Sequence, residues 1–220
     1  MKFTLVVFDM DGTILDTLED LQDSLNVILE KYGFPTRTLE EVRRFVGNGI
    51  LRLIEQAVPA GCSRDEIEKV YQDFLLYYQE HSALKTRPYG GIVKLLSDLK
   101  EKGMKLAVVS NKADTAVQDL CVRYFNGLFD MAVGERKGME KKPAPDMVEL
   151  VLDMLQVPKD AAVYIGDSEV DVATAKNSGL HLCAVDWGFR DVDVLKEHGA
   201  ELIFSDTESL KEYLIHENFE

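Results

Sequence analysis

The sequence predicts an α/β protein: a doubly wound parallel sheet interrupted by an inserted α-helical domain. Residues 3–8 (FTLVVF) form a short apolar run rich in β-branched side chains, the pattern of a strand buried on both faces. Residues 16–87 show helical patterns only, and from residue 88 onward strands and helices alternate. We therefore expect a Rossmann-like core made of residues 1–15 and 88–220, with a helical cap domain at 16–87.

The expected elements follow from hydrophobic periodicity. In the helical stretch, apolar residues recur at helical spacing, beginning with Leu18, Leu21, Leu25, Ile28 and Leu29, and no convincing strand is found there. Beyond residue 88 the expected strands are 105–109, 129–133, 161–165 and 180–185, and the expected helices are 92–102, 113–124, 145–155 and 170–178, followed by a closing strand and helix. We expect the helical insert after the first strand to act as a lid over the strand ends.

Charge and composition exclude several kinds of partner. The formal net charge is -14 and the pI is near 4.7, so the overall field repels nucleic acid and anionic membranes. A small anion can still bind where a cation and backbone amides make a local positive site. The sequence offers no run of about 20 apolar residues and no secretory leader, so we expect a cytoplasmic protein, monomeric or homodimeric.

Polar residues follow successive strands at their expected carboxyl ends. They are Asp9 and Asp11, then Ser110 and Asn111, then Lys142 in a loop, then Asp167 and Asp171. In a doubly wound sheet these positions converge, and clustered carboxylates repel one another unless a cation relieves them. Oxygen ligands without His or Cys favour Mg²⁺.

Four sequence motifs carry a specific resemblance. Residues 9–13 (DMDGT), 110–111 (SN), 142–143 (KP) and 166–171 (GDSEVD) resemble, in order, the four motifs of the haloacid dehalogenase superfamily. Any one alone would also suit a turn, a helix cap or a solvated loop, but capping does not require all four in this order. The resemblance implies a magnesium-dependent phosphatase that acts on a small phosphorylated metabolite.

The resemblance also implies roles for the first motif. Asp9 would be the nucleophile that becomes an aspartyl phosphate, and it would bind the metal. Asp11 would be the general acid and base, with its backbone carbonyl on the metal. Gly12 would allow a tight loop beside the phosphate, and Thr13 would orient the nucleophile by hydrogen bonding.

The other motifs would bind the phosphoryl group and the cation. Ser110 and the amide of Asn111 would hydrogen-bond phosphoryl oxygens, and Lys142 would offset negative charge on Asp9 and the transferring group. Asp167 would bind magnesium directly, whereas Asp171 would act through a bound water or on the ligands themselves.

The position of the insert resembles the helical-cap (C1-type) subclass, and residues 45–51 (FVGNGIL) resemble a loop of its phosphoglycolate phosphatase-like members. This loop implies that Asn48 meets the substrate, although an ordinary helix–helix turn is an equal interpretation. Arg52 and Lys112 are candidates for binding a substrate carboxylate or second phosphate, or are surface charges.

The alternatives are a β-phosphoglucomutase-like phosphosugar mutase, an inorganic pyrophosphatase and a non-enzymatic phospho-ligand sensor. Asp11 disfavours dehalogenation, because dehalogenases resembling this fold have a non-acidic residue there. It also disfavours a sensor, in which a long-lived aspartyl phosphate would not suit a hydrolytic neighbour.

Overall fold

The computed structural model describes residues 3–216, and the chain folds into two compact units. One unit comprises Met1–Leu15 and Pro88–Glu220, and the other comprises Asp16–Arg87. The segments that join them contain two short strands, β2 (Leu15–Asp16) and β3 (Arg87–Pro88), which pair with each other. The role of the second unit as a cap stays a prediction.

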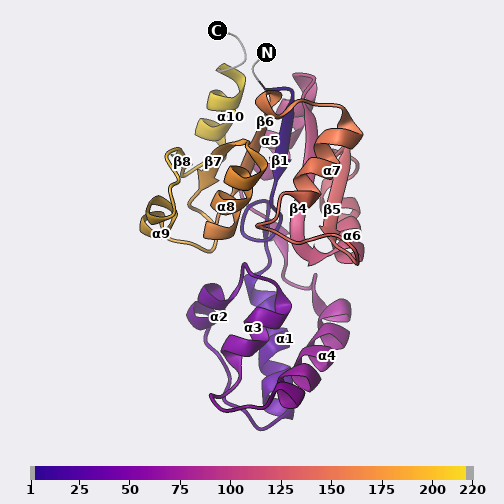
Figure 1. The fold of residues 1–220 in the computed structure, drawn as a ribbon, viewed down its shortest axis with the longest axis vertical. Helices are drawn as coiled ribbons and strands as arrows, with labels where there is room; N and C mark the ends of the chain where they lie inside the picture. Colours follow the sequence, from indigo (N-terminus) through magenta and orange to yellow (C-terminus); the bar gives the residue numbers. More distant parts are fainter. Residues whose placement is uncertain (1–2, 217–220) are drawn as a thin grey trace. The chain divides into compact units, whose positions relative to one another are not determined.

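The first unit is built on a six-stranded sheet whose order is β5-β4-β1-β6-β7-β8. Its strands are β1 (Leu5–Phe8), β4 (Lys105–Ala113), β5 (Met131–Glu135), β6 (Ala162–Gly166), β7 (His181–Val185) and β8 (Ile203–Phe204), all paired in parallel. The first strand lies between β4 and β6 (Figure 1), so the strand order reverses there. The predicted doubly wound α/β fold is confirmed, and its carboxyl-end crevice falls at β1.

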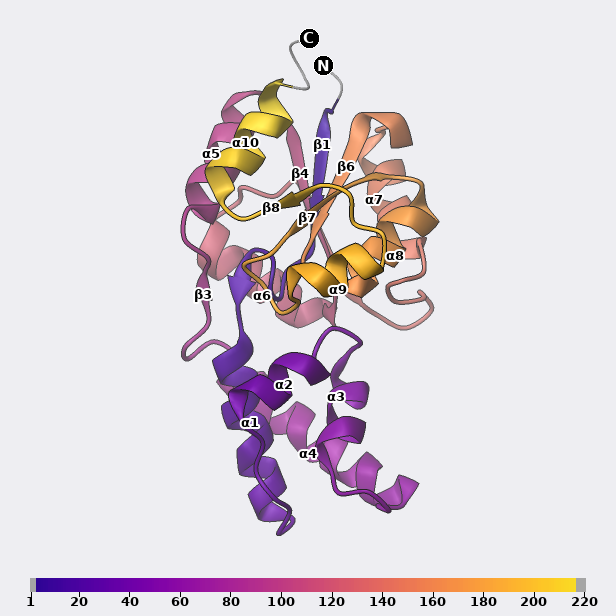
Figure 2. The same ribbon diagram turned by 90° about the vertical axis from the view of Figure 1, so that its left-hand side faces the viewer.

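Helices cover both faces of this sheet. They are α5 (Ile92–Glu101), α6 (Asp114–Phe125), α7 (Asp146–Leu155), α8 (Glu169–Ser178), α9 (Val192–Glu197) and α10 (Thr207–His216), with a 3₁₀ turn at Lys159–Ala161. Figure 2 shows α5 and α10 on one side of the sheet and α7 and α8 on the other. Every residue of β1 is buried, as its unbroken apolar run predicts.

The observed elements differ from the predicted ones at their ends and in a few short pieces. The strand β4 runs to Ala113 instead of ending at 109, and its pairing with β5 shifts register between Val109 and Ala113. This irregularity contains residues 110–112. The two-residue strands β2 and β3 and the six-residue helix α9 were not predicted, since elements this short show no periodicity.

The second unit is helical, as predicted. Its helices are α1 (Leu18–Lys31), α2 (Leu39–Phe45), α3 (Ile50–Ala57) and α4 (Arg64–His81). Thr38 with Glu41, and Ser63 with Glu66, form capping boxes that fix where α2 and α4 begin. Within residues 3–216, no helix is both long and apolar enough to cross a bilayer.

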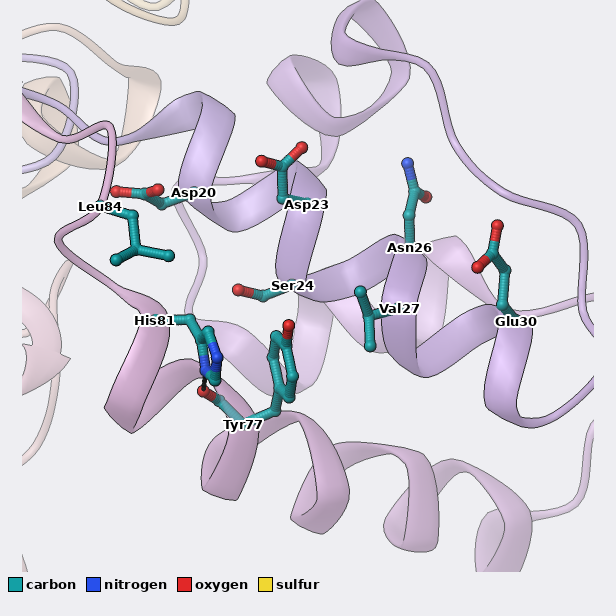
Figure 3. A pocket seen from close by; sticks show the side chains of 9 residues that line it. All are labelled: Asp20, Asp23, Ser24, Asn26, Val27, Glu30, Tyr77, His81 and Leu84. Atoms are coloured by element: carbon teal, nitrogen blue, oxygen red, sulfur yellow. Dashed lines mark hydrogen bonds between the residues drawn. The ribbon is translucent and has the colours of Figure 1, made fainter.

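A groove of about 400 Å³ lies between α1 and α4 within the helical unit. Figure 3 shows its lining, in which Ser24 on α1 faces Tyr77 and His81 on α4. The Tyr77 and His81 rings stack with centroids 3.8 Å apart. Ser24 is 1% exposed, and its hydroxyl has no hydrogen-bond partner among the residues that the structure describes.

Asp20, which also lines this groove, binds the backbone of the segment after α4. Its carboxylate accepts hydrogen bonds from the backbone N–H of Lys85 at 2.9 Å and of Thr86 at 2.7 Å, and the side chain is buried. These bonds attach the segment that follows α4 to the start of α1. The carboxylate is therefore occupied by the chain itself.

We expect Asp20→Ala to destabilise the protein by about 3 kcal/mol, because it leaves two backbone donors without their charged acceptor. Asp23→Ala is the matched control. Asp23 lies one turn on in the same helix, 54% exposed in its side chain, and pairs with the exposed Lys85, so its loss should change stability far less. Thermal unfolding of both variants tests this, and equal effects would contradict it.

Candidate active site

The nucleophile candidate Asp9 lies in a buried ionic network directly beyond β1. The Lys142 Nζ lies 2.7 Å from Asp9 Oδ1 and 2.8 Å from Asp171 Oδ1. It also donates to the Tyr164 hydroxyl at 3.2 Å, and that hydroxyl donates to Asp171 at 3.1 Å. Lys142 is 4% exposed and Asp171 fully buried, so water screens these charges little.

Three carboxylates gather in this network. Asp9, Asp167 and Asp171 each offer an oxygen within 4.8 Å of the others, and all three are buried. Burial raises the pKa of Asp9 well above its ordinary value; Lys142 opposes this rise, while Asp171 and Asp167 add to it. Burial and the neighbouring Asp171 raise the pKa of Asp167 to about 7.

This donor set fits a divalent cation. The oxygens that would bind the ion belong to carboxylates, which are hard ligands. A single lysine, Lys142, lies among the three acids and cannot balance the charge of all of them when they are ionised. Burial works against Lys142, but Asp171 and Asp9 outweigh it and raise the pKa of Lys142 well above its ordinary value. The ammonium is therefore charged, and a bound divalent cation would add positive charge that favours the ionised forms of the three acids.

The turn after Asp9 brings its backbone against Asp167. Gly12 has φ of 90°, and a Cβ there would lie 2.3 Å from Asp167 Oδ2, so only glycine fits. The predicted role of Thr13 needs correction: its hydroxyl donates to Asp167 Oδ1 at 2.9 Å, not to Asp9. The threonine positions the proposed metal ligand because the turn carries its side chain toward β6.

The irregular end of β4 supplies the second motif. Asn111 exchanges two hydrogen bonds with the Lys142 backbone, donating from Nδ2 to its carbonyl at 3.0 Å and accepting its N–H at 2.8 Å. Ser110 is buried, and its hydroxyl accepts the Lys112 N–H at 3.2 Å. The Asn111 side chain thus holds the lysine loop, a role that the sequence did not indicate.

Lys112 lies beside the candidate acid and base. Its Nζ is 3.0 Å from Asp11 Oδ1, and its side chain is 5% exposed. This ion pair rules out the interpretation of Lys112 as a surface charge. Binding of a substrate carboxylate by Lys112 stays a prediction.

The fourth motif begins α8. Asp171 accepts hydrogen bonds from both the N–H and the hydroxyl of Ser168, at 3.1 and 2.6 Å, and forms a capping box with it. This fixes the Asp171 carboxylate next to Lys142. Asp171 is fully buried, so its carboxylate faces this network and not solvent.

Asn48 and Arg52 lie in the helical unit. Asn48 is exposed in the loop between α2 and α3, flanked by Gly47 and Gly49 with positive φ. Arg52, in α3, pairs with Glu55 at 2.9 Å and is 58% exposed in its side chain. Contact of either residue with a substrate stays a prediction.

Sequence reasoning missed two contributors to the site. Tyr164 lies within the apolar run of β6, where its hydroxyl is the only polar side-chain group. Residues 187–189 follow β7, and no role was predicted for them. In the structure, Phe189 donates its backbone N–H to Asp167 Oδ2 at 2.7 Å. Backbone donors leave no residue signature, so only coordinates could reveal this contact.

Comparisons with known proteins show the family of the chain. The family model described as haloacid dehalogenase-like hydrolase matches residues 6–185. A phosphoglycolate phosphatase of Aquifex aeolicus (strain VF5) is 31% identical over 187 residues, covering 84% of this chain and 85% of that protein. The N-acetylmuramic acid 6-phosphate phosphatase of Pseudomonas aeruginosa is 29% identical, covering 92% and 94%.

A solved structure is also similar over nearly its whole length. It is a proposed phosphoglycolate phosphatase from Lactobacillus delbrueckii subsp. bulgaricus ATCC BAA-365, 41% identical, with a TM-score of 0.93 and coverage of 97% and 99%. The family match over residues 6–185 places this α/β chain among the hydrolytic enzymes. It belongs to the haloacid dehalogenase-like hydrolase family.

Proposed function

We propose that this phosphatase hydrolyses a small phosphomonoester of phosphoglycolate-like chemistry through an aspartyl phosphate on Asp9, with Mg²⁺ as cofactor. The observation that carries the proposal is the Asp9–Lys142 pair at 2.7 Å in a buried acid cluster. An ionised carboxylate is a nucleophile, and the lysine beside Asp9 opposes the rise in its pKa and offsets the charge of an incoming phosphoryl group.

Asp9, Asp167 and the Asp11 carbonyl are the proposed ligands of the cation. Bound Mg²⁺ would supply positive charge to the phosphoryl oxygens and orient them for in-line displacement. Asp171 and Lys142 stay bonded to each other and hold the position of Asp9. Burial of this cluster excludes bulk water from the reacting atoms.

The reaction balances in two displacements. In the first, a carboxylate oxygen of Asp9 attacks phosphorus, the bond from phosphorus to the leaving oxygen breaks, and Asp11 donates a proton to that oxygen. In the second, Asp11 takes a proton from water as the water oxygen attacks phosphorus. The bond from Asp9 to phosphorus then breaks, releasing phosphate and restoring both carboxyl groups.

The substrate is proposed to carry a carboxylate as well as the phosphate. Two of the matched relatives are named for phosphoglycolate and for N-acetylmuramic acid 6-phosphate, both of them phosphorylated acids. In this chain Lys112 lies beside Asp11, close to where a leaving group would be protonated. Arg52 is the second candidate cation, from the helical unit.

A matched substrate panel tests the proposal. Phosphoglycolate is compared with ethyl phosphate, which has no carboxylate, and with sugar phosphates, pyrophosphate and nucleoside monophosphates, each with Mg²⁺ and with EDTA. We expect phosphate release to require Mg²⁺ and to favour phosphoglycolate over ethyl phosphate by about 10²-fold in kcat/KM, since a lost charged contact costs about 2 to 3 kcal/mol. Absence of release from every compound would refute the proposal.

A mutase is the second candidate, because Asp11 could pass protons between two sugar hydroxyls. The structure of a proposed β-phosphoglucomutase from Bacteroides vulgatus shares the fold at 22% identity and a TM-score of 0.76, which bears on the fold alone. Phosphorus NMR of the sugar-phosphate reactions separates the two, since a mutase moves the phosphoryl group without accumulating inorganic phosphate.

A further inference from the structure

Residues 187–189, between β7 and α9, contact both loops that would hold the cation. We propose that this segment, here called the brace, positions Asp167 and the turn at residues 12–13, and thereby sets the affinity of the site for its divalent cation. The inference rests on the proposed function, since it requires a cation at Asp167. It assigns a role to residues that carry none of the superfamily motifs.

The brace holds the carboxylate of Asp167 from one side. The Phe189 N–H donates to Asp167 Oδ2 at 2.7 Å, while the Thr13 hydroxyl donates to Oδ1 at 2.9 Å. Each carboxylate oxygen therefore has one fixed donor and keeps lone pairs for a metal ion. Such bonds to a ligand fix its orientation and raise affinity by sparing it reorganisation on binding.

The brace also holds the turn after Asp9. The Trp187 indole N–H donates to the Thr13 backbone carbonyl at 3.0 Å, 174 residues away in sequence. The Thr13 side chain in turn donates to Asp167. The brace therefore bonds both members of the Thr13–Asp167 pair, through Trp187 and through Phe189. Moving the brace would displace the turn and the carboxylate together.

Gly188 shows how closely the brace packs against the turn at Gly12 and against Asp167. A Cβ at this position would lie 2.3 Å from the Gly12 carbonyl oxygen, 2.4 Å from Asp167 Oδ2 and 2.5 Å from Asp167 Cβ. Its φ lies outside the left-handed region, so a substitution here tests proximity and not backbone strain. The added Cβ would thus meet backbone and the Asp167 carboxylate. Two hydrogen bonds hold this carboxylate, so it cannot rotate away freely.

The experiment compares Gly188→Ala with Gly90→Ala. Gly90 lies in the same unit, also without left-handed φ, and a Cβ there meets nothing within 4 Å. Mg²⁺ affinity is measured by calorimetry on EDTA-stripped protein and by the emission of Trp187, the only tryptophan of the chain. We expect Gly188→Ala to weaken Mg²⁺ binding by about 10- to 100-fold and Gly90→Ala to leave it unchanged.

Kinetics separate positioning from a general loss of structure. For Gly188→Ala we expect saturating Mg²⁺ to restore most of kcat, with the KM for substrate little changed. A purely structural defect would lower kcat at every Mg²⁺ concentration. Failure of restoration in a variant whose Mg²⁺ affinity equals that of the unsubstituted protein would overturn the proposal.

A second variant guards against misfolding of the first. Trp187→Phe keeps an aromatic ring but removes the N–H donor, and we expect it to weaken Mg²⁺ binding by about 3- to 10-fold in calorimetry. Unchanged affinity in every variant that folds, alongside Mg²⁺ binding by the unsubstituted protein, overturns the brace and leaves the proposed function intact. Absence of Mg²⁺ binding by the unsubstituted protein overturns both.

Discussion

Asp9→Asn is expected to lower kcat by about 10³-fold or more, because the amide lacks the anionic oxygen that would attack phosphorus. The variant should fold at least as well as the unsubstituted protein. Burial raises the pKa of Asp9 well above its ordinary value, so this carboxylate is held in the folded state against its preference for water. Phosphate release and thermal unfolding measure the two effects separately.

Asp98→Asn is the control for this variant. Asp98 lies on α5 in the same unit and forms partly exposed ion pairs with Lys94 and Lys211, away from the acid cluster, so its neutralisation should leave turnover unchanged. Acid-quenched enzyme analysed by mass spectrometry should carry a phosphoryl group on Asp9 during turnover, and the Asp9→Asn variant should carry none. An Asp9→Asn variant that keeps more than about a hundredth of the activity would exclude the nucleophile assignment.

The features that the sequence predicted well are those with a strong local pattern. The unbroken apolar run at residues 5–8 indicates a buried strand, and acids directly after such strands are expected to lie at one edge of a parallel sheet. The structure accordingly brings Asp9, Asp167 and Asp171 together from β1 and the β6–α8 junction. Spacing alone sufficed because the sheet determines where its strand ends meet.

The partners of individual side chains were harder to predict. The sequence places Thr13 near both Asp9 and Asp167, and only the turn geometry decides that its hydroxyl bonds Asp167. Lys112 lies beyond the predicted strand end at 109, in the part of β4 where the register shifts, and its ammonium pairs with Asp11. Side-chain direction changes with a single residue of register, which apolar patterns do not resolve.

Contacts made through the backbone were not predictable at all. The brace acts on Asp167 through the N–H of Phe189, a group that every residue but proline possesses. Tyr164 was hidden for a related reason, since one hydroxyl within an apolar strand resembles ordinary packing until Lys142 is seen beside it. Both contacts, from Phe189 to Asp167 and from Lys142 to Tyr164, join segments that lie far apart in the sequence, so only the folded structure reveals them.

Lys142→Met is expected to cost about 3 to 5 kcal/mol of stability in metal-free protein near pH 8, because it leaves three buried carboxylates without their cation. Activity should fall as well, since neither Asp9 nor the transferring phosphoryl group then has an ammonium beside it. Urea unfolding in EDTA, followed by circular dichroism, measures the loss of stability.

The loss should depend on pH in a definite direction. Burial raises the pKa of Asp9 well above its ordinary value, and Lys142 opposes that rise. Without the lysine the pKa of Asp9 is higher still, so the folded variant binds more protons than the unfolded chain between about pH 4 and the raised pKa. Its stability therefore falls as pH rises through this window, and the defect is smallest near pH 5.

Mg²⁺ and a surface lysine provide the decisive comparisons. Adding Mg²⁺ near pH 8 should recover part of the lost stability, since the ion supplies positive charge to the same carboxylates. Lys94→Met removes an exposed partner of Asp98 and should give a small change that Mg²⁺ does not affect. A Lys142 defect of equal size at pH 5 and pH 8, and insensitive to Mg²⁺, would mean that the lysine acts through packing and not through charge, because only a charge is linked to protons and metal.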